Sequence, residues 1–153
     1  ASMNLFNAIN KYRRANWCYK HNLRFLARFF EMRIYQAHNC FVPSCCELGE
    51  GTVFGYKGIG VVVGKKVSVG KNCMISQNVT IGGRGGHDDM PTIGDNCYIG
   101  AGAEVLGPIT IGDNVVIGAG AVMISDAPSN TVWAGVPAKC VKTIEKRGTL
   151  SDF

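Results

Sequence analysis

The clearest candidate for chemistry in this chain is a histidine followed by two carboxylates, in the run His87-Asp88-Asp89. Imidazole has an unperturbed pKa that suits removing a proton from a hydroxyl at neutral pH, and a neighbouring carboxylate can orient the ring. The other two histidines, His21 and His38, lie in the first 40 residues. We therefore predict that His87 is a general base steadied by Asp88 or Asp89, with a solvated loop histidine as the alternative.

Two Gly-rich stretches that interrupt a regular pattern hold further polar candidates. The first runs from Phe54 to Gly64 and contains Tyr56 and Lys57, and the second runs from Gly83 to Thr92 and contains Arg84. Insertions into a strict repeat map to its functional face. We therefore predict that Tyr56, Lys57 and Arg84 contact a substrate.

The pattern that these stretches interrupt has a period of six residues. Aliphatic side chains recur at this spacing, and most are followed by Gly: Val63, Val69, Ile75, Ile81, Ile93, Ile99, Val105, Ile111, Ile117 and Met123. A period of six fits neither a helix nor an alternating strand. It is typical of a parallel β-helix solenoid, in which short strands are separated by turns and the aliphatic side chains stack inside. Asp95-Asn96 and Asp113-Asn114 suit corners that need unusual backbone angles.

Length and composition fit one domain with an appendage, because the chain has 153 residues and 46% hydrophobic content. No apolar run is long enough for a membrane span, and no signal peptide is recognisable. The seven cysteines have no zinc-type spacing. We therefore expect a reduced, cytoplasmic protein without a metal site.

The positive charge is concentrated at the N-terminus. Residues 1–40 hold seven basic side chains and one acid, Glu31, whereas residues 41–153 hold nine basic and ten acidic side chains. Residues 4–38 are predicted to form two helices with a break between Trp17 and Asn22. Two roles stay open for them: a cap on the open end of the solenoid, or a basic amphipathic surface that meets an acidic membrane or a partner.

The repeats resemble those of the hexapeptide-repeat acyltransferases. Roughly residues 40–143 are similar to serine acetyltransferases and to O-acetyltransferases of surface-polysaccharide loci. The similarity lies in the runs Gly60-Val-Val-Val-Gly64, Ser76-Gln-Asn-Val-Thr-Ile-Gly-Gly83, Ile99-Gly-Ala-Gly-Ala103, Leu106-Gly-Pro-Ile109, Ile117-Gly-Ala-Gly-Ala-Val122 and Ala134-Gly-Val-Pro-Ala-Lys139. The resemblance implies a left-handed β-helix with three hexads per coil, acetyl-CoA as donor, and a homotrimer with active sites between subunits.

The resemblance also implies where the donor binds. The matching backbone positions for the pantetheine arm and the CoA-binding segment are Ala101, Gly118, Ala119, Ala134, Gly135, Val136 and Pro137, with Lys139 and Lys142 near the CoA phosphates. We accordingly expect a helical segment (1–40), a mainly β domain that ends in the CoA-binding segment (41–142), and a polar tail (143–153).

Two departures from serine acetyltransferase bear on the acceptor. Lys57 stands where that family has a histidine, which makes Lys57 the rival candidate for the base, and Met90 rather than a histidine precedes Pro91. The stretches around Lys57 and His87 look more like the polysaccharide branch. The preferred acceptor is therefore a sugar hydroxyl, with serine as the alternative and a non-catalytic β-solenoid scaffold as a further one. No nucleic-acid partner is expected.

Overall fold

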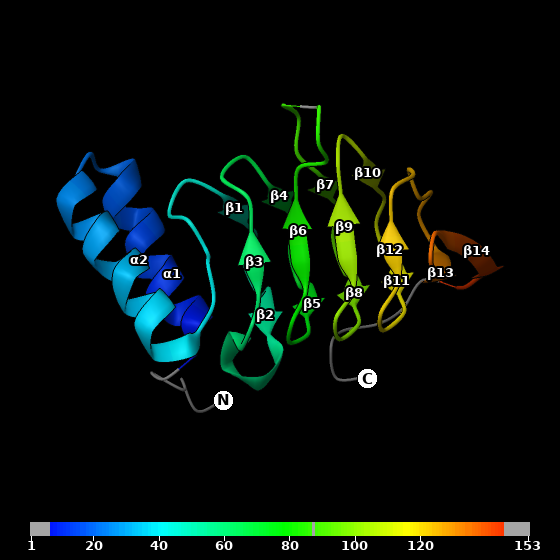
Figure 1. Ribbon diagram of the computed structural model, residues 1–153, viewed down its shortest axis with the longest axis horizontal. Helices are drawn as coiled ribbons and strands as arrows, with labels where there is room; N and C mark the ends of the chain where they lie inside the picture. Colours follow the sequence, from blue (N-terminus) through cyan, green and yellow to red (C-terminus); the bar gives the residue numbers. More distant parts are fainter. Residues whose placement is uncertain (1–6, 87, 146–153) are drawn as a thin grey trace.

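The computed structural model describes residues 7–86 and 88–145, which form two helices followed by a stack of short strands (Figure 1). Helix α1 spans Ala8–Lys20 and α2 spans Arg24–His38. The strands are β1 Glu47–Leu48, β2 Val53–Phe54, β3 Val62–Val63, β4 Ser68–Val69, β5 Met74–Ile75, β6 Thr80–Gly82, β7 Thr92–Ile93, β8 Tyr98–Ile99, β9 Glu104–Leu106, β10 Thr110–Ile111, β11 Val116–Ile117, β12 Val122–Met123, β13 Thr131–Gly135 and β14 Ala138–Thr143, with a 3₁₀ turn, η1, at Gly55–Gly58.

The strands form three sheets that enclose the core. The first sheet has the order β1-β4-β7-β10, the second β2-β5-β8-β11-β13-β14, and the third β3-β6-β9-β12. All neighbours are parallel except β13 and β14, and Ile99 pairs with Ile117 eighteen residues later, so one coil takes three hexads. The predicted left-handed parallel β-helix, mainly β with a short helical segment, is confirmed.

The interior is built from the residues that carry the six-residue period. All ten aliphatic side chains of the series, from Val63 to Met123, are at most 2% exposed. Burial of each such side chain is worth roughly 1.5–3 kcal/mol. The glycines that follow allow the coils to stack, because a Cβ on Gly70 would lie 2.6 Å from the carbonyl carbon of Gly94. The Asn corners also agree with the prediction, since Asn96 and Asn114 have φ of 55° and 56°.

Helix α1 closes the open end of the solenoid by binding backbone groups of the first coil. The Tyr12 hydroxyl donates to the Cys46 carbonyl over 2.6 Å and accepts from the Leu48 N–H over 3.2 Å. Arg13 donates to the carbonyls of Leu48 and Gly49. Burial raises the pKa of the Tyr12 phenol well above its ordinary value, so the group remains a donor at neutral pH. The first of the two roles left open by the sequence, the cap, is therefore filled by α1.

Removing the Tyr12 hydroxyl should destabilise the fold measurably, although the substitution deletes a single oxygen atom. Tyr12→Phe leaves the buried Leu48 N–H without its acceptor and the Cys46 carbonyl with only the longer bond of 3.3 Å from the Asn16 amide, so we expect the free energy of unfolding to fall by about 1–3 kcal/mol. Denaturant unfolding followed by circular dichroism measures it. Tyr35→Phe is the matched control, because Tyr35 is 61% exposed. A loss of similar size in both variants would contradict the capping role of the Tyr12 hydroxyl.

Two segments differ from the expectation: the break between the helices and the C-terminal part of the described chain. The break between the helices lies at residues 21–23, so Trp17 belongs to α1, because apolar packing against α2 extends the helix to Lys20. Residues 138–143 form a β-hairpin with β13, so Thr143 is paired and not part of a loose tail. The division into three segments at residues 40 and 142 stays a prediction. Within the described residues, neither helix combines the length and the apolar character that crossing a membrane requires.

Candidate active site

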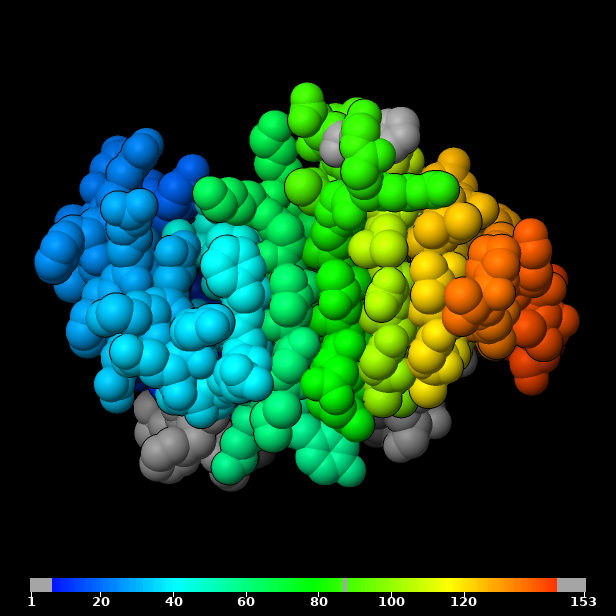
Figure 2. Space-filling model, in the orientation of Figure 1, coloured from blue at the N-terminus to red at the C-terminus, as the bar shows by residue number. Residues whose placement is uncertain are grey.

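The predicted site residues lie on two different corners of the prism. Residues 55–61, with η1, connect the second sheet to the third, at the bottom of the stack in Figure 1. Residues 83–86 and 88–91 follow β6 and connect the third sheet to the first, where they project from the top of the stack (Figures 1 and 2). We call these corners the turn corner and the loop corner.

The turn corner holds Tyr56 and Lys57 in a backbone conformation that costs energy. Their φ values are 46° and 63°, so two consecutive non-glycine residues occupy the left-handed region. Both side chains are exposed, and Tyr56 is 76% exposed. Strained backbone of this kind tends to occur at functional sites. The side chains of this turn therefore face solvent and are available to a ligand.

A second imidazole lies near this turn. His38, at the end of α2, is 7% exposed, and its Nε2 is 2.9 Å from the Lys11 ammonium. Burial lowers the pKa of His38, and the positive charges of Lys11 and Lys57 lower it further. His38 is therefore a neutral acceptor that Lys11 already occupies, which suits a structural role better than proton removal from a substrate.

Small residues follow the turn corner from coil to coil and leave the backbone open. Gly120 donates to the carbonyl of Ala101, and Gly102 donates to that of Gln77. Gly102 and Gly120 have φ of 68° and 67°, and a Cβ on either would meet no atom within 4 Å. Ala101 and Gly118 are half-buried and Ala119 is exposed. These residues (Ala101, Gly102, Gly118, Ala119 and Gly120) form what we call the donor row. The donor row can accept an extended chain such as a pantetheine arm lying against the backbone.

The C-terminal hairpin continues the row past the last coil. Gly118 donates to the carbonyl of Trp133 on β13, so the hairpin is stacked on the previous corner. The predicted donor residues of this segment are all exposed: Ala134, Gly135, Val136, Pro137, Lys139 and Lys142. Lys139 pairs with Ala134 across the hairpin. The two ammonium groups can thus meet phosphates at one end of the row.

The loop corner carries Asp88, Asp89 and Arg84, and all three side chains are exposed. His87 lies outside the described residues. The loop is held at both ends: Arg84 packs beside Gly107, and the sulfur of Met90 lies against Gly64. A hollow of about 350 Å³ beside it is lined by Lys66, Asp89, Met90, Thr92, Pro108, Ile109 and Thr110. This corner therefore presents a polar recess of the size of a small substrate.

One chain does not bring the two corners together. The turn corner precedes β3 and the loop corner follows β6. The two corners therefore lie at opposite ends of the strands of the third sheet (Figure 1). One hexad of extended chain spans roughly 15–20 Å. Tyr56, Lys57 and the donor residues thus share one corner, whereas Arg84, Asp88 and Asp89 share the other. Among the described residues, no cluster of three or more His, Cys, Asp or Glu side chains could hold a metal ion.

Comparison with known proteins assigns the fold to a superfamily. Residues 90–125 match the family profile of bacterial transferase hexapeptide (six repeats). A serine acetyltransferase from Brucella abortus, solved in complex with coenzyme A, superposes with a TM-score of 0.86 and 33% identity over 92% of this chain and 56% of that one. The repeats are therefore those of the bacterial hexapeptide transferases, the superfamily that the fold matches.

Within this superfamily, serine acetyltransferases are among the relatives found. The enzyme of Synechococcus elongatus is 38% identical over 138 residues, which are 89% of this chain and 56% of the relative. The enzyme of Escherichia coli K12 is 35% identical over 138 residues, 89% of this chain and 50% of the relative. The chain thus spans about half the length of the curated relatives that it matches.

Two features of the site were missed by the sequence reasoning. The open glycines Gly102 and Gly120 are eighteen residues apart, so the spacing of the coils could have identified them. The effect of the Lys57 charge on the pKa of His38 could not have been found, because it depends on how α2 packs against the first coil.

Proposed function

We propose that this protein is an acetyl-CoA-dependent O-acetyltransferase. The observation that carries the proposal is its similarity to serine acetyltransferases at 38% and 35% identity over 89% of the chain. The open row of small residues at the turn corner supports it, since a CoA arm needs an accessible backbone and Gly102 and Gly120 leave one. The free thiols of all seven cysteines are in keeping with the cytoplasmic setting that we expect.

Serine is the acceptor that the comparisons favour, which reverses the order of preference from the sequence alone. Each relative compared is named a serine acetyltransferase. A sugar hydroxyl remains the second candidate on one observation. The strained turn presents Lys57 at the position where, by resemblance, serine acetyltransferases have a histidine, so the surroundings of the acceptor differ.

The proposed acetyl transfer requires the chain to bind both substrates and to remove one proton. Acetyl-CoA supplies a thioester carbonyl carbon, to which the acceptor oxygen bonds as the C–S bond breaks. We propose that His87 removes the proton of the acceptor hydroxyl and that Asp88 or Asp89 steadies the ring. The departing sulfur takes up a proton, so the products are an O-acetyl ester and free CoA.

We further propose a homotrimer in which the turn corner of one subunit meets the loop corner of the next. The outward positions of the second sheet form an apolar column, in pairing order Val53, Met74, Tyr98, Val116 and Val132. Each is half-buried within one chain, whereas the first sheet presents Glu47, Ser68, Thr92 and Thr110 outward. An apolar column on one face supports self-association.

An acceptor screen tests the proposed activity. Release of free thiol from acetyl-CoA is followed with L-serine and with a panel of neutral and amino sugars. We expect acetyl transfer to at least one hydroxyl compound, with serine fastest. Turnover with a sugar but not with serine would reverse the choice of acceptor. Binding of acetyl-CoA without turnover on any of these compounds would contradict the proposed reaction.

Removing the Lys139 ammonium should weaken the binding of acetyl-CoA by about two- to fivefold, the range for an exposed ion pair. The loss should be absent with S-acetyl-pantetheine, which lacks the nucleotide phosphates. Calorimetric titration of Lys139→Ala with both donors measures it. Lys71→Ala, an exposed lysine on another corner, is the control for general charge. An equal loss for both donors would show that Lys139 acts through the hairpin structure instead.

A further inference from the structure

Helix α2 presents apolar side chains on the side that faces away from the protein. Its buried residues are Ala27, Ile34 and His38. About half a turn away, at the helical spacing of 100° per residue, lie Phe25, Phe29 and Met32, which are 87%, 46% and 50% exposed. A contiguous exposed apolar face of this kind marks an interaction site on a folded protein.

Cations flank this apolar face on both sides. At the same helical spacing, Arg24 and Arg28 lie along one flank and Arg33 along the other. The helix has one acid, Glu31, and its carboxylate is turned inward, accepting from the N–H and the hydroxyl of Ser44 over 2.6 and 2.5 Å. Among the described residues none of the three arginines forms an ion pair. The outward surface of α2 is therefore apolar and positively charged, with no exposed acid.

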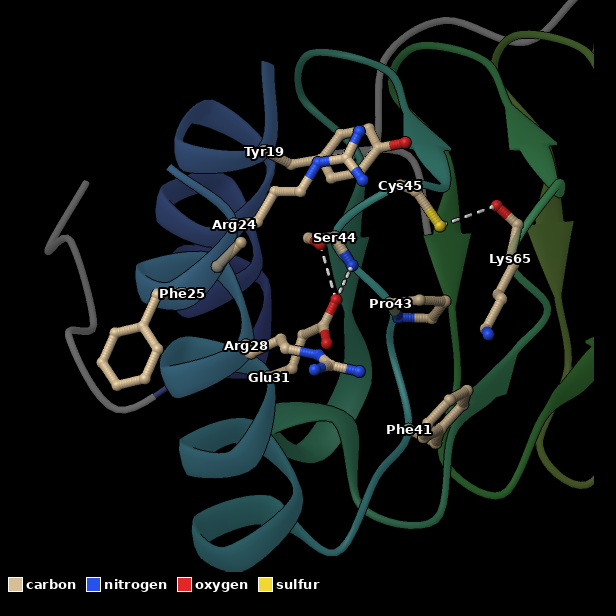
Figure 3. A pocket seen from close by; sticks show the side chains of 11 residues that line it. Tyr19, Arg24, Phe25, Arg28, Glu31, Phe41, Pro43, Ser44, Cys45 and Lys65 are labelled. Atoms are coloured by element: carbon tan, nitrogen blue, oxygen red, sulfur yellow. Dashed lines mark hydrogen bonds between the residues drawn. The ribbon is translucent and has the colours of Figure 1, made fainter. Parts of the chain in front are cut away.

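A hollow of about 600 Å³ adjoins this face between α2 and residues 41–45. Figure 3 shows the Arg24 guanidinium beside the ring of Tyr19 and that of Arg28 near Glu31, and Phe25 lines the hollow from α2. Lys65, across the hollow on the first coils, adds a third cation. The apolar wall includes Phe41 and Pro43. The hollow thus combines three cations with an apolar wall and with the Glu31 carboxylate, which already accepts from Ser44.

The charge pattern decides what can cover this surface. A second copy of the chain would bring arginines against arginines, since the face carries no acid to pair with them, and like charges across an interface cost affinity. A partner surface that is both anionic and apolar can bind the arginines of α2 and cover its apolar face. An aromatic face flanked by arginines is the composition of helices that lie in the plane of a bilayer.

We propose that α2 docks on membranes rich in acidic phospholipid, with Phe25, Phe29 and Met32 in the acyl boundary and a headgroup phosphate received between Arg24, Arg28 and Lys65. Figure 2 supports the geometry, because the helices lie at one end of the molecule and the loop corner projects elsewhere. Both corners of the candidate active site then stay in water. The proposal does not depend on which acceptor the enzyme uses.

Co-sedimentation with vesicles tests the proposal. The full chain should bind vesicles of phosphatidylglycerol and phosphatidylcholine and should not bind vesicles of phosphatidylcholine alone. Each basic residue near an acidic surface contributes roughly fivefold. Arg24→Ala with Arg28→Ala should therefore weaken the partition coefficient by about 25- to 30-fold. Lys66→Ala with Lys71→Ala removes the same charge elsewhere on the solenoid and should lose much less. Phe25→Ser with Phe29→Ser should abolish the binding that survives at high salt.

Three outcomes would overturn the proposal. Equal losses in the two charge variants would indicate attraction by net charge without a site. No binding to acidic vesicles would leave the face to another occupant. A change in the sedimentation coefficient of Phe25→Ser with Phe29→Ser in the absence of lipid would make it a subunit interface. The circular dichroism spectrum of each variant should match that of the parent, because these side chains are exposed.

Discussion

His87→Ala should lower kcat for acetyl transfer by about 10²–10⁴-fold, the usual worth of a general base. Acetyl-CoA affinity should change little, because the proposed role of His87 is to take a proton from the acceptor and not to bind the donor. A loss in kcat with unchanged donor binding indicates an interaction that acts in the transition state. Steady-state kinetics together with donor titration of the same variant provide both numbers.

The parent enzyme should also lose activity as the pH falls and an imidazole base takes up a proton, and His87→Ala should remove this dependence. Asp88→Asn and Asp89→Asn serve as companions, and only one of them should reduce kcat if a single carboxylate orients the ring. Lys57→Ala is the decisive comparison, since Lys57 occupies the strained turn. If Lys57→Ala abolishes turnover while His87→Ala retains most of it, the base is the lysine.

The fold could be predicted because the aliphatic side chains that build its core recur every six residues in the sequence. Each hexad places one aliphatic side chain inside, and a single pattern from Val63 to Met123 therefore specifies strands, turns and core together. The cap was harder to assign. Tyr12 and Arg13 bind carbonyls of the first coil about 35 residues later, and nothing in the local pattern of a helix predicts such a contact.

The candidate site was predicted less completely, for a geometric reason. Sequence reasoning chose residues in the two interruptions of the repeat, and both interruptions do expose polar side chains. It did not place the two interruptions relative to one another within one chain, and the topology puts them before β3 and after β6. Whether the two corners meet depends on how subunits assemble, and the repeat pattern of one chain does not reveal that.

Mixing two inactive variants should restore activity. Ala119→Trp blocks the donor row with a bulky side chain at an exposed position, and His87→Ala removes the proposed base from the loop. Each variant alone should be nearly inactive. In a cyclic trimer one patch contacts a different patch of the next chain, so about a quarter of the boundaries in an equal random mixture would combine an intact row with an intact loop. We therefore expect about a quarter of the parent activity per site.

The result depends on mixed trimers, which two different affinity tags on the co-expressed chains can isolate. His87→Ala mixed with a chain that carries both substitutions is the control, because no boundary in that mixture has an intact loop, and it should stay inactive. Sedimentation should report three chains in every sample. If purified mixed trimers stay as inactive as the single variants, the site does not combine the donor row of one subunit with the loop of its neighbour, and the proposed assembly of the two corners is wrong.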